Sequence, residues 1–287
     1  MKQIKIAILK KRINVSIPYT DLGLCDLLWE YRIPDEPGIA DNSLNVQILP
    51  ATFPPDIMPA TSESYSGFVT HGVDVGNGVE PFLFCFREGS SIFCVRKDSV
   101  ANYTALIQLM IHDSYKKALQ TVLLLESLAD SILGVHSVAM EYGGRVVLVS
   151  APSGTGKSTH TEIWRRQFGA KIINGDYGFL EPNGDEILYH GTPFSGSSEY
   201  CEKGIWRVSD MVIIRQAKKN QVERLGGHTA YVKIMENSFV PRWDVEKSQM
   251  ALDLILNIMK NIRIWRLSCT PELEAAVVLR NALFDLT

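Results

Sequence analysis

The sequence lacks three features that often point directly to a function: a cysteine pattern, an excess of charge of one sign, and an internal repeat or low-complexity tract. None of its five cysteines is spaced as C-x-x-C, the arrangement typical of zinc sites and redox centres. With 29 basic and 32 acidic side chains, the formal net charge of −3 gives no general attraction to nucleic acid or to an anionic membrane. We therefore expect neither of these among its partners.

The sequence also predicts neither a signal peptide nor a membrane-spanning segment. Residues 1–5 do not show the charged-then-apolar layout of a signal peptide. The most apolar stretch, Ala118–Val135, is interrupted by Gln120, Glu126 and Asp130 and so falls short of a bilayer span. The sequence therefore predicts a soluble, cytoplasmic protein.

Two of the cysteines are expected to lie close together. Residues 82–87 and 92–96 are predicted to be the strands of a hairpin, and a two-residue Gly-Ser loop between them places Cys85 directly opposite Cys94. Such a pair fits either a cross-strand disulfide or two buried free thiols. A cytosolic compartment and the odd number of cysteines favour the free thiols.

The 287 residues are enough for one large domain or two modest ones, and we predict two. Residues 1–98 form a predicted β-rich domain, because segments 13–17 and 44–48 alternate apolar and polar side chains as half-buried strands do. Several prolines separate these strands. This half contains no motif that indicates a chemical activity.

Residues 99–287 are predicted to form a second domain, in which strands and helices alternate. Residues 101–133 have long apolar faces and neither glycine nor proline, which favours one helix that ends at Gly134. Alternating strands and helices predict an α/β core. The other expected elements are strands at 145–150, 171–174 and 211–215 and helices at 159–168, from Asp244 to about Lys260, and from Thr270 to about Phe284.

Residues 151–158 read Ala-Pro-Ser-Gly-Thr-Gly-Lys-Ser and match the phosphate-binding loop pattern G-x-x-x-x-G-K-[ST], with alanine in place of the first glycine. A predicted strand precedes this motif and a predicted helix follows it, as such a loop requires. The two glycines let backbone N–H groups point inward at phosphate oxygens, and the helix dipole adds to the attraction. The expected nucleotide-binding residues are Ser153, Gly154, Thr155, Gly156, Lys157, Ser158 and Thr159.

The motif also predicts the cofactors. Lys157 is expected to reach the β- and γ-phosphates of a nucleotide, and Ser158 to offer its hydroxyl to Mg²⁺. We therefore expect ATP or GTP, together with Mg²⁺, to bind here. A glycine-rich turn between strand and helix with no ligand is the alternative interpretation.

Asp176 and His136 are the further candidates for catalysis. Asp176 follows the predicted strand 171–174, so its carboxylate is expected at the end of that strand which, in a parallel sheet, lies beside the phosphate loop. Phosphoryl transfer needs an acid to hold the metal or to accept the proton of the acceptor hydroxyl. Asn-Gly-Asp is also ordinary turn chemistry, and a lone histidine such as His136 is more often a surface or satisfied core residue.

Taken together, these residues resemble the HPr kinase/phosphorylase group and its phosphoenolpyruvate carboxykinase-like relatives, over roughly residues 130–287. That group has a histidine segment, a short hairpin into the phosphate-loop strand, and an acid after the next strand. The counterparts are residues 136–139, Gly143-Gly144, residues 151–158 and Gly175-Asp176. The resemblance implies a P-loop-containing HPr kinase-like α/β core, with Asp176 as catalytic or metal carboxylate and His136 in the active site.

Two departures from the family pattern matter. The family often has two adjacent acids where this chain has Gly175-Asp176-Tyr177, so Asp176 matches either the base or the metal ligand. The family's Glu-x-Arg-Gly signature is echoed only by Glu202-Lys203-Gly204, and lysine does not reproduce the bidentate phosphate grip of arginine.

The resemblance implies a kinase that transfers a phosphoryl group from ATP or GTP to a hydroxyl, with a serine of a small protein or peptide precursor as the leading acceptor. A small-molecule kinase on the same scaffold and a nucleotide-binding regulator with little catalysis are the alternatives. Because related HPr kinases assemble into rings, a homo-oligomer is expected. The N-terminal half is then a docking or oligomerisation module.

Overall fold

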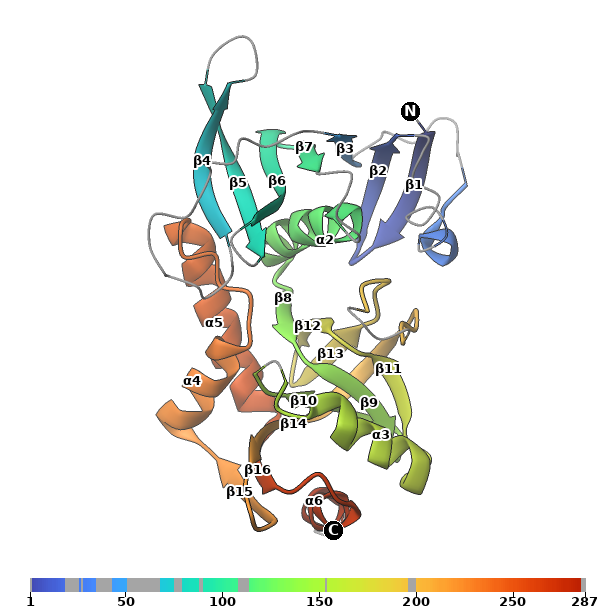
Figure 1. Ribbon diagram of the computed structural model, residues 1–287, viewed down its shortest axis with the longest axis vertical. Helices are drawn as coiled ribbons and strands as arrows, with labels where there is room; N and C mark the ends of the chain where they lie inside the picture. Colours follow the sequence, from blue (N-terminus) through green and yellow to red (C-terminus); the bar gives the residue numbers. More distant parts are fainter. Residues whose placement is uncertain are drawn as a thin grey trace. The chain divides into compact units, whose positions relative to one another are not determined.

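The computed structural model describes residues 2–18, 26, 28–34, 43–50, 68–74, 79–87, 90–107, 114–152, 154–195 and 200–284 (Figure 1). It divides into two compact units, Met1–Leu125 and Glu126–Thr287. This boundary lies later in the chain than the predicted one between residues 98 and 99. The difference arises because the next strand along the chain, Asn102–Ile107, completes the sheet of the first unit by pairing with two of its strands.

The described strands of the first unit form a seven-stranded sheet in the order β1-β2-β3-β7-β6-β5-β4. Strand β3 is parallel to β2 and β7, and the other neighbours are antiparallel. The bounds are β1 Lys2–Ile8, β2 Lys11–Ile17, η1 Trp29–Tyr31, β3 Leu44–Pro50, β4 Phe68–Asp74, β5 Val79–Arg87, β6 Ser90–Ser99, β7 Asn102–Ile107 and α2 Ser114–Ser127.

The two faces of this sheet differ, as the alternation at 13–17 and 44–48 predicted. Ile13, Val15 and Val46 are buried on one face, as expected for a sheet with one solvated side. On the other face, asparagines link three neighbouring strands. Asn14 donates to Asn45 at 2.9 Å, and Asn45 donates to Asn102 at 3.0 Å.

The β5–β6 hairpin has a register different from the predicted one. A bulge between Cys85 and Phe86 shifts the pairing, so that Cys85 lies opposite Phe93 and Cys94 lies opposite Phe84. The prediction that Cys85 faces Cys94 was therefore wrong by one residue. Cys94 is a buried free thiol, and burial raises its pKa to about 12.

The prediction of a single helix over residues 101–133 is also wrong in part. The segment contains β7, α2 and a short 3-10 helix, Leu128–Asp130, and it ends at the start of β8. Gly134 lies inside β8, and Ser131, with φ of 60°, is the left-handed residue that ends the short helix. The alternation of exposed and buried side chains in β7 is the period-two signal that a helical interpretation overlooks.

The described strands of the second unit form a nine-stranded sheet in the order β11-β9-β10-β14-β13-β12-β8, with β16 and β15 branching from β14. The bounds are β8 Leu133–His136, β9 Val138–Tyr142, β10 Arg145–Ser150, α3 Lys157–Phe168, β11 Lys171–Asn174, β12 Tyr177–Asn183, β13 Glu186–His190, β14 Ile205–Gln216, β15 Gln221–Leu225, α4 Gly227–Glu236, α5 Val245–Asn261, β16 Arg263–Cys269 and α6 Leu273–Phe284.

The long strand β14 joins two parts of this sheet. Its first half pairs antiparallel with β13, and its second half pairs parallel with β16, while β10 runs parallel along its other edge. Helices α3 and α6 pack on the β9, β10, β14 and β16 strands through one apolar cluster that includes the fully buried Trp164. Strands and helices alternate in this region, as predicted, and together they form a mixed α/β arrangement.

Local signals set several of the element ends. The Gly143-Gly144 turn has φ of 61° and 77°, as a tight hairpin turn between β9 and β10 requires. Asp244 caps α5 by accepting the backbone N–H of Lys247 at 3.0 Å, as predicted. Helix α6 begins at Leu273, slightly later than the predicted start at Thr270. Within the described part of the chain, no helix has both the length and the apolar character needed to cross a bilayer.

Candidate active site

The motif 151–158 lies between the end of β10 and the first turn of α3, as predicted, and Ser153 falls outside the described residues. Gly154 and Gly156 have φ of +75° and +113°. A Cβ atom at either position meets no atom within 4 Å, so it is the backbone conformation rather than lack of space that requires glycine here. Gly156 is the N-cap of α3 and provides no side-chain cap. The N-cap residue of α3 therefore leaves the first N–H groups of the helix without a bond from its own side chain, which is compatible with anion binding there.

Alanine in place of the first glycine has a structural explanation. Ala151 is fully buried in the apolar cluster beneath α3 and α6. Its carbonyl oxygen accepts a hydrogen bond from Nζ of Lys157 at 2.6 Å, across the loop. Burial lowers the pKa of Lys157, and the negative charge of Asp176 acts against that change. The half-buried ammonium group is therefore close enough to the Asp176 carboxylate to interact with its charge.

The loop, His136 and Asp176 meet at one edge of the sheet. Strand β9 is antiparallel to both β10 and β11, so β10 and β11 run in the same direction without being neighbours. The prediction placed Asp176 beside the loop on the assumption of adjacent parallel strands. Asp176 and the loop do follow the carboxyl ends of strands that run in the same direction, but β9 lies between β10 and β11.

Two strand junctions form a corner at this edge. Ser137 separates β8 from β9, and Gly175-Asp176 separates β11 from β12. On one side of the corner β9 pairs with β11, and on the other side β8 pairs with β12, with His136 opposite Tyr177. The N–H of Ser137 donates to the carbonyl of Asp176 at 2.9 Å and joins the two junctions.

The buried side chain of Asn174 fixes the second junction. Its Oδ1 atom accepts the N–H groups of Asp176 at 2.9 Å and Tyr177 at 3.2 Å, an Asx-type turn. Its Nδ2 group donates to the carbonyl of Phe194 at 3.0 Å. The Asn-Gly-Asp sequence thus does form a turn, and that turn also orients the Asp176 carboxylate.

The corner brings His136 and Asp176 into contact. Nε2 of His136 lies 3.3 Å from Oδ1 of Asp176, and both side chains are partly exposed. The carbonyl of His136 accepts the hydroxyl of Ser150, the last residue of β10, at 2.6 Å. The histidine ring stacks on Tyr177 with the ring centroids 6.1 Å apart. Burial raises the pKa of the Tyr177 hydroxyl, and the Asp176 charge adds to that effect.

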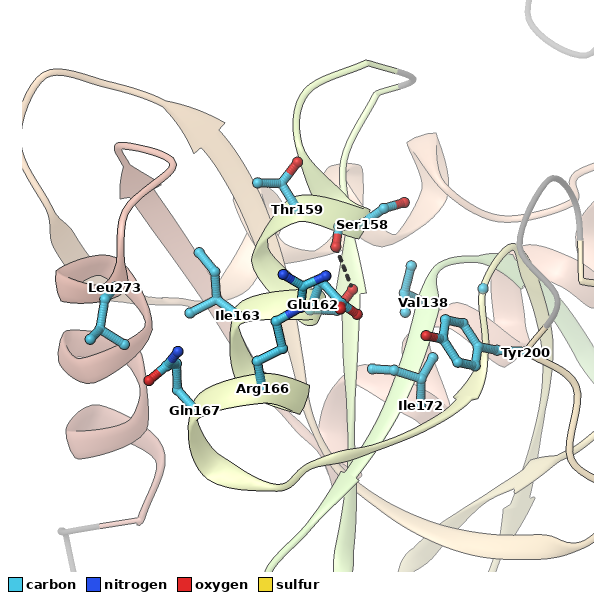
Figure 2. A pocket seen from close by; sticks show the side chains of 12 residues that line it. Val138, Ser158, Thr159, Glu162, Ile163, Arg166, Gln167, Ile172, Tyr200 and Leu273 are labelled. Atoms are coloured by element: carbon cyan, nitrogen blue, oxygen red, sulfur yellow. Dashed lines mark hydrogen bonds and ion pairs between the residues drawn. The ribbon is translucent and has the colours of Figure 1, made fainter.

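A cavity of about 650 Å³ lies against α3, next to this corner, and its lining extends from Leu273 on one side of the helix to Tyr200 on the other (Figure 2). Ser158 and Thr159 of the first helical turn line its upper end, and Gly175, next to Asp176, also lines it. Glu162 and Arg166 lie further along the helix, 2.5 Å apart in an ion pair. The exposed Tyr200 closes the side away from the helix. The cavity is open to solvent, because Ser158, Thr159 and Arg166 are exposed residues.

The two candidate metal ligands at this site are both oxygen donors. Among the described residues, no group of three or more His, Cys, Asp or Glu side chains is arranged to hold a metal ion. The hydroxyl of Ser158 and the carboxylate of Asp176 are hard oxygen ligands, and Mg²⁺ commonly uses one or two carboxylates together with phosphate oxygens and water. The residues present are therefore compatible with the expected cofactor.

Sequence reasoning did not single out two residues next to Asp176, and it found only an echo of the family signature at residues 202–204. Asn174 and Tyr177 flank the Asp176 turn, and the signals for Asn174 were its position at the end of an apolar strand and the turn preference of Asn-Gly-Asp. Glu202, from the segment that echoes the Glu-x-Arg-Gly signature, pairs with Lys171 at 3.1 Å on the surface. A Cβ atom on Gly204 overlaps the Trp206 ring, so this glycine serves close packing.

Comparisons with known proteins show a distant likeness to solved structures. No protein-family model matches the chain, and no curated protein sequence does. Among solved structures, the chain is similar to the HPr(Ser) kinase/phosphatase from Coxiella burnetii, at 9% sequence identity and a TM-score of 0.34. The match covers 53% of this chain and 97% of that chain. It is a distant fold relationship over about half of the protein.

Proposed function

We propose that this protein is a kinase that transfers the terminal phosphoryl group of ATP or GTP to a hydroxyl, with Mg²⁺ as cofactor. The observation that carries the proposal is the His136–Asp176 contact of 3.3 Å, at the sheet edge where a phosphate-loop motif enters α3. An acid beside a phosphate site is what phosphoryl transfer requires. The half-buried Lys157, which interacts electrostatically with Asp176, supports the same proposal.

Each residue has a chemical role in this proposal. The N–H groups of Gly154 to Ser158 and the start of α3 bind the phosphates, and Lys157 exchanges the Ala151 carbonyl for a phosphate oxygen. Bound Mg²⁺ neutralises charge on the phosphate oxygens. The acceptor oxygen attacks the γ-phosphorus, its proton passes to Asp176, and the bond to the β-phosphate oxygen breaks to release the nucleoside diphosphate. His136 positions the carboxylate through the 3.3 Å contact.

The same carboxylate also fits the role of metal ligand, and two measurements separate the roles. Asp176→Asn keeps the shape but removes both the base and the charged metal ligand. If Asp176 is a metal ligand, the variant needs far more Mg²⁺ for half-maximal rate, and Mn²⁺ restores part of the activity. If it is the base, the rate at saturating Mg²⁺ stays low with either metal.

A peptide or small-protein acceptor, with serine as its hydroxyl, is the form we propose. The supporting observation is the solvent-open cavity of about 650 Å³ beside Gly175, since an extended chain enters an open cavity more readily than a closed one. A small-molecule kinase is the second candidate. Incubation with labelled ATP, Mg²⁺ and panels of serine peptides, small carrier proteins and small alcohols discriminates between the two by which panel acquires label.

A nucleotide-binding regulator with little catalysis is favoured by one specific observation, the single acid at the Gly175-Asp176-Tyr177 turn. If wild-type protein binds ATP but no panel member acquires label, this reading replaces the kinase. Lys157→Ala serves as the negative control, because it weakens nucleotide binding in both readings. Failure of wild-type protein to bind ATP contradicts both.

We further propose that the first unit is a docking or oligomerisation module, so that a homo-oligomer forms. Among the described strands, β4 ends the sheet and pairs only with β5, and an edge strand presents backbone groups that another chain can pair with. Light scattering of the full-length protein measures the assembly state directly. A monomer at every concentration contradicts the oligomerisation part of the proposal.

A further inference from the structure

The cavity beside Asp176 has a charged wall that the phosphate-loop motif does not explain. Glu162 and Arg166, on α3, line this cavity of about 650 Å³, and Arg165 belongs to the same cluster. Arg165 donates to the Glu162 carboxylate from Nε at 2.8 Å and from Nη2 at 2.7 Å, and Arg166 donates from Nε at 2.5 Å. Two guanidinium groups therefore share one carboxylate, which leaves the cluster with one surplus positive charge.

The Glu162 carboxylate remains ionised in this cluster. Hydrogen bonds from Arg165 and Arg166, together with the charges of both, lower the pKa of Glu162 from 4.5 to about 2. The carboxylate therefore holds both arginines at neutral pH and restricts the rotamers of two otherwise flexible side chains. A binding group that is already held in place loses less conformational entropy when a ligand arrives.

One edge of the Arg166 guanidinium is available to a ligand. The Arg166 side chain is 67% exposed, and within the described part of the chain the guanidinium bonds only to Glu162, through Nε. The Nη1 and Nη2 atoms thus have no protein acceptor among the described residues. Their edge presents two parallel N–H groups, the geometry that binds a carboxylate with two hydrogen bonds. Arg165, by contrast, already uses both Nε and Nη2 on Glu162.

The surfaces next to this edge are aliphatic and aromatic. Val138 and Ile172 are buried and line the cavity, and the exposed Tyr200 lines it as well. Figure 2 shows both aliphatic side chains between α3 and Tyr200. Arg165 lies close enough to Tyr200 for its charge to interact with the tyrosine hydroxyl. A ligand that fits here has a carboxylate for Arg166 and an uncharged portion that packs on the aliphatic side chains.

We propose that the acceptor is an acidic peptide segment, in which an Asp or Glu near the reacting serine binds the Nη1 and Nη2 edge of Arg166. This inference rests on the proposed function, because it assumes that the cavity receives the peptide acceptor of a kinase. It adds a residue that selects the acceptor, and it names the charge that this residue selects. Arg165 strengthens the attraction, because it contributes to the surplus positive charge of the cluster.

Helix geometry sets the expected spacing between the serine and the acid. The serine hydroxyl must reach the phosphate at the start of α3, beside Ser158, whereas the Arg166 guanidinium reaches back to Glu162. Ser158 and Glu162 are four residues apart, which is about 6 Å along the axis at about 1.5 Å per residue. An extended chain advances about 3.3 Å per residue, so the acid is expected about two residues from the serine.

The test uses the full-length protein with ATP, Mg²⁺ and a series of serine peptides whose sequence is otherwise uncharged. A single residue, placed from one to four positions before or after the serine, is Glu, Gln or Lys in turn. We expect the wild-type kcat/KM for the Glu peptide to exceed that for the Gln peptide about three- to fivefold, with the largest ratio about two residues from the serine. The effect is modest because Arg166 is largely exposed, and it should fall below twofold at about 0.5 M salt.

Variants assign the preference to one side chain. Arg166→Gln should bring the Glu-to-Gln ratio of kcat/KM close to one, and Arg166→Glu should make the Lys peptide the preferred acceptor. A reversed preference in Arg166→Glu also shows that this variant folds. Arg207→Gln is the matched control, because the Arg207 side chain is 65% exposed and pairs with Glu186 at 3.1 Å, outside the cavity lining. This control should retain the wild-type ratio.

The outcomes separate this inference from the proposed function. If the wild-type protein binds ATP but labels no serine peptide of any charge, the peptide-kinase function fails and the inference fails with it. If the wild-type protein labels the Glu, Gln and Lys peptides at equal rates, the kinase function is retained and the acidic preference is overturned. If the preference exists but is the same in Arg166→Gln as in Arg207→Gln, Arg166 is not the residue that selects the acceptor.

Discussion

Nε2 of His136 lies 3.3 Å from Oδ1 of Asp176, although the two residues come from different strand junctions. The contact exists because β8 pairs with β12 on one side of the corner while β9 pairs with β11 on the other. A carboxylate oriented by an imidazole beside a phosphate-loop motif is a suitable arrangement for accepting a hydroxyl proton.

Replacing Asp176 tests its proposed role as the catalytic carboxylate in phosphoryl transfer. We expect Asp176→Asn to lower the rate of phosphoryl transfer by about 100-fold or more, since a positioned base contributes roughly that much. Nucleotide affinity should change by only a few fold, because the loop and Lys157 are intact. Single-turnover transfer of labelled phosphate and calorimetry provide the two measurements. Asp185→Asn, in the exposed β12–β13 turn, is the matched control, and an equal rate in both variants rules out a catalytic Asp176.

Replacing Lys157 tests whether its ammonium group binds the phosphates of the nucleotide. Lys157→Ala removes a half-buried ammonium group that donates to the Ala151 carbonyl. Charge-assisted hydrogen bonds contribute about 1.5–3 kcal/mol, so ATP affinity should fall by about 10- to 150-fold. Lys171→Ala, whose ammonium pairs with Glu202 on the surface, should leave ATP affinity unchanged. Similar ATP affinities for the two variants contradict a phosphate-binding Lys157.

The backbone conformation of Gly156 predicts that folding stability and ATP binding depend strongly on having glycine at this position. Gly156→Ala forces an L-residue to φ of +113°, which costs about 1–3 kcal/mol of folding free energy or reshapes the loop. We expect ATP binding to be lost in either case. Gly226 has an extended φ of −145° and open space around it, so Gly226→Ala should change stability by less than about 1 kcal/mol and leave binding intact. Chemical denaturation and calorimetry measure both effects, and a Gly156→Ala variant with normal ATP affinity is the contrary result.

The burial of His160 predicts how the folding stability of the protein depends on pH. Its pKa is lowered from 6.5 to about 4 in the folded protein, because burial disfavours the charged ring. Between these two values the unfolded chain binds the extra proton, so this residue's contribution is complete above about pH 6.5 and decreases as the pH falls towards 4. The full loss is about 3 kcal/mol, at 1.36 kcal/mol for each pKa unit.

Urea denaturation from pH 7 to pH 4 measures this effect. His160→Gln does not titrate in that range, so the difference in unfolding free energy between wild type and variant should narrow or reverse as the pH falls. His228→Gln, at an exposed position of α4, should run parallel to the wild type. If the His160→Gln curve is also parallel to the wild type, the histidine is not buried in its neutral form.

Elements with strong local signals could be predicted from the sequence. The strand, glycine-containing loop and helix of residues 145–168 follow from a buried apolar run and from glycines at the two positions with positive φ. The cap of α5 at Asp244 and the Gly143-Gly144 turn follow from side-chain and backbone preferences of single residues.

Elements that depend on distant partners were harder to predict. β7 was interpreted as the start of a helix, because its neighbours β3 and β6 in the sheet cannot be inferred from residues 101–107 alone. The register of the β5–β6 hairpin was shifted by a bulge between Cys85 and Phe86, for which the turn sequence gives no signal.

The sequence alone was sufficient to specify the loop motif around Gly154, Gly156 and Lys157, because the backbone conformations and the ammonium group belong to a few consecutive residues. Only the tertiary structure could bring His136 to Asp176, since their contact depends on Asn174 and Ser137 holding two strand junctions at one corner. It alone also placed the ends of β14 and β16 beside the loop, because strand pairing over long sequence separations decides which chain ends meet.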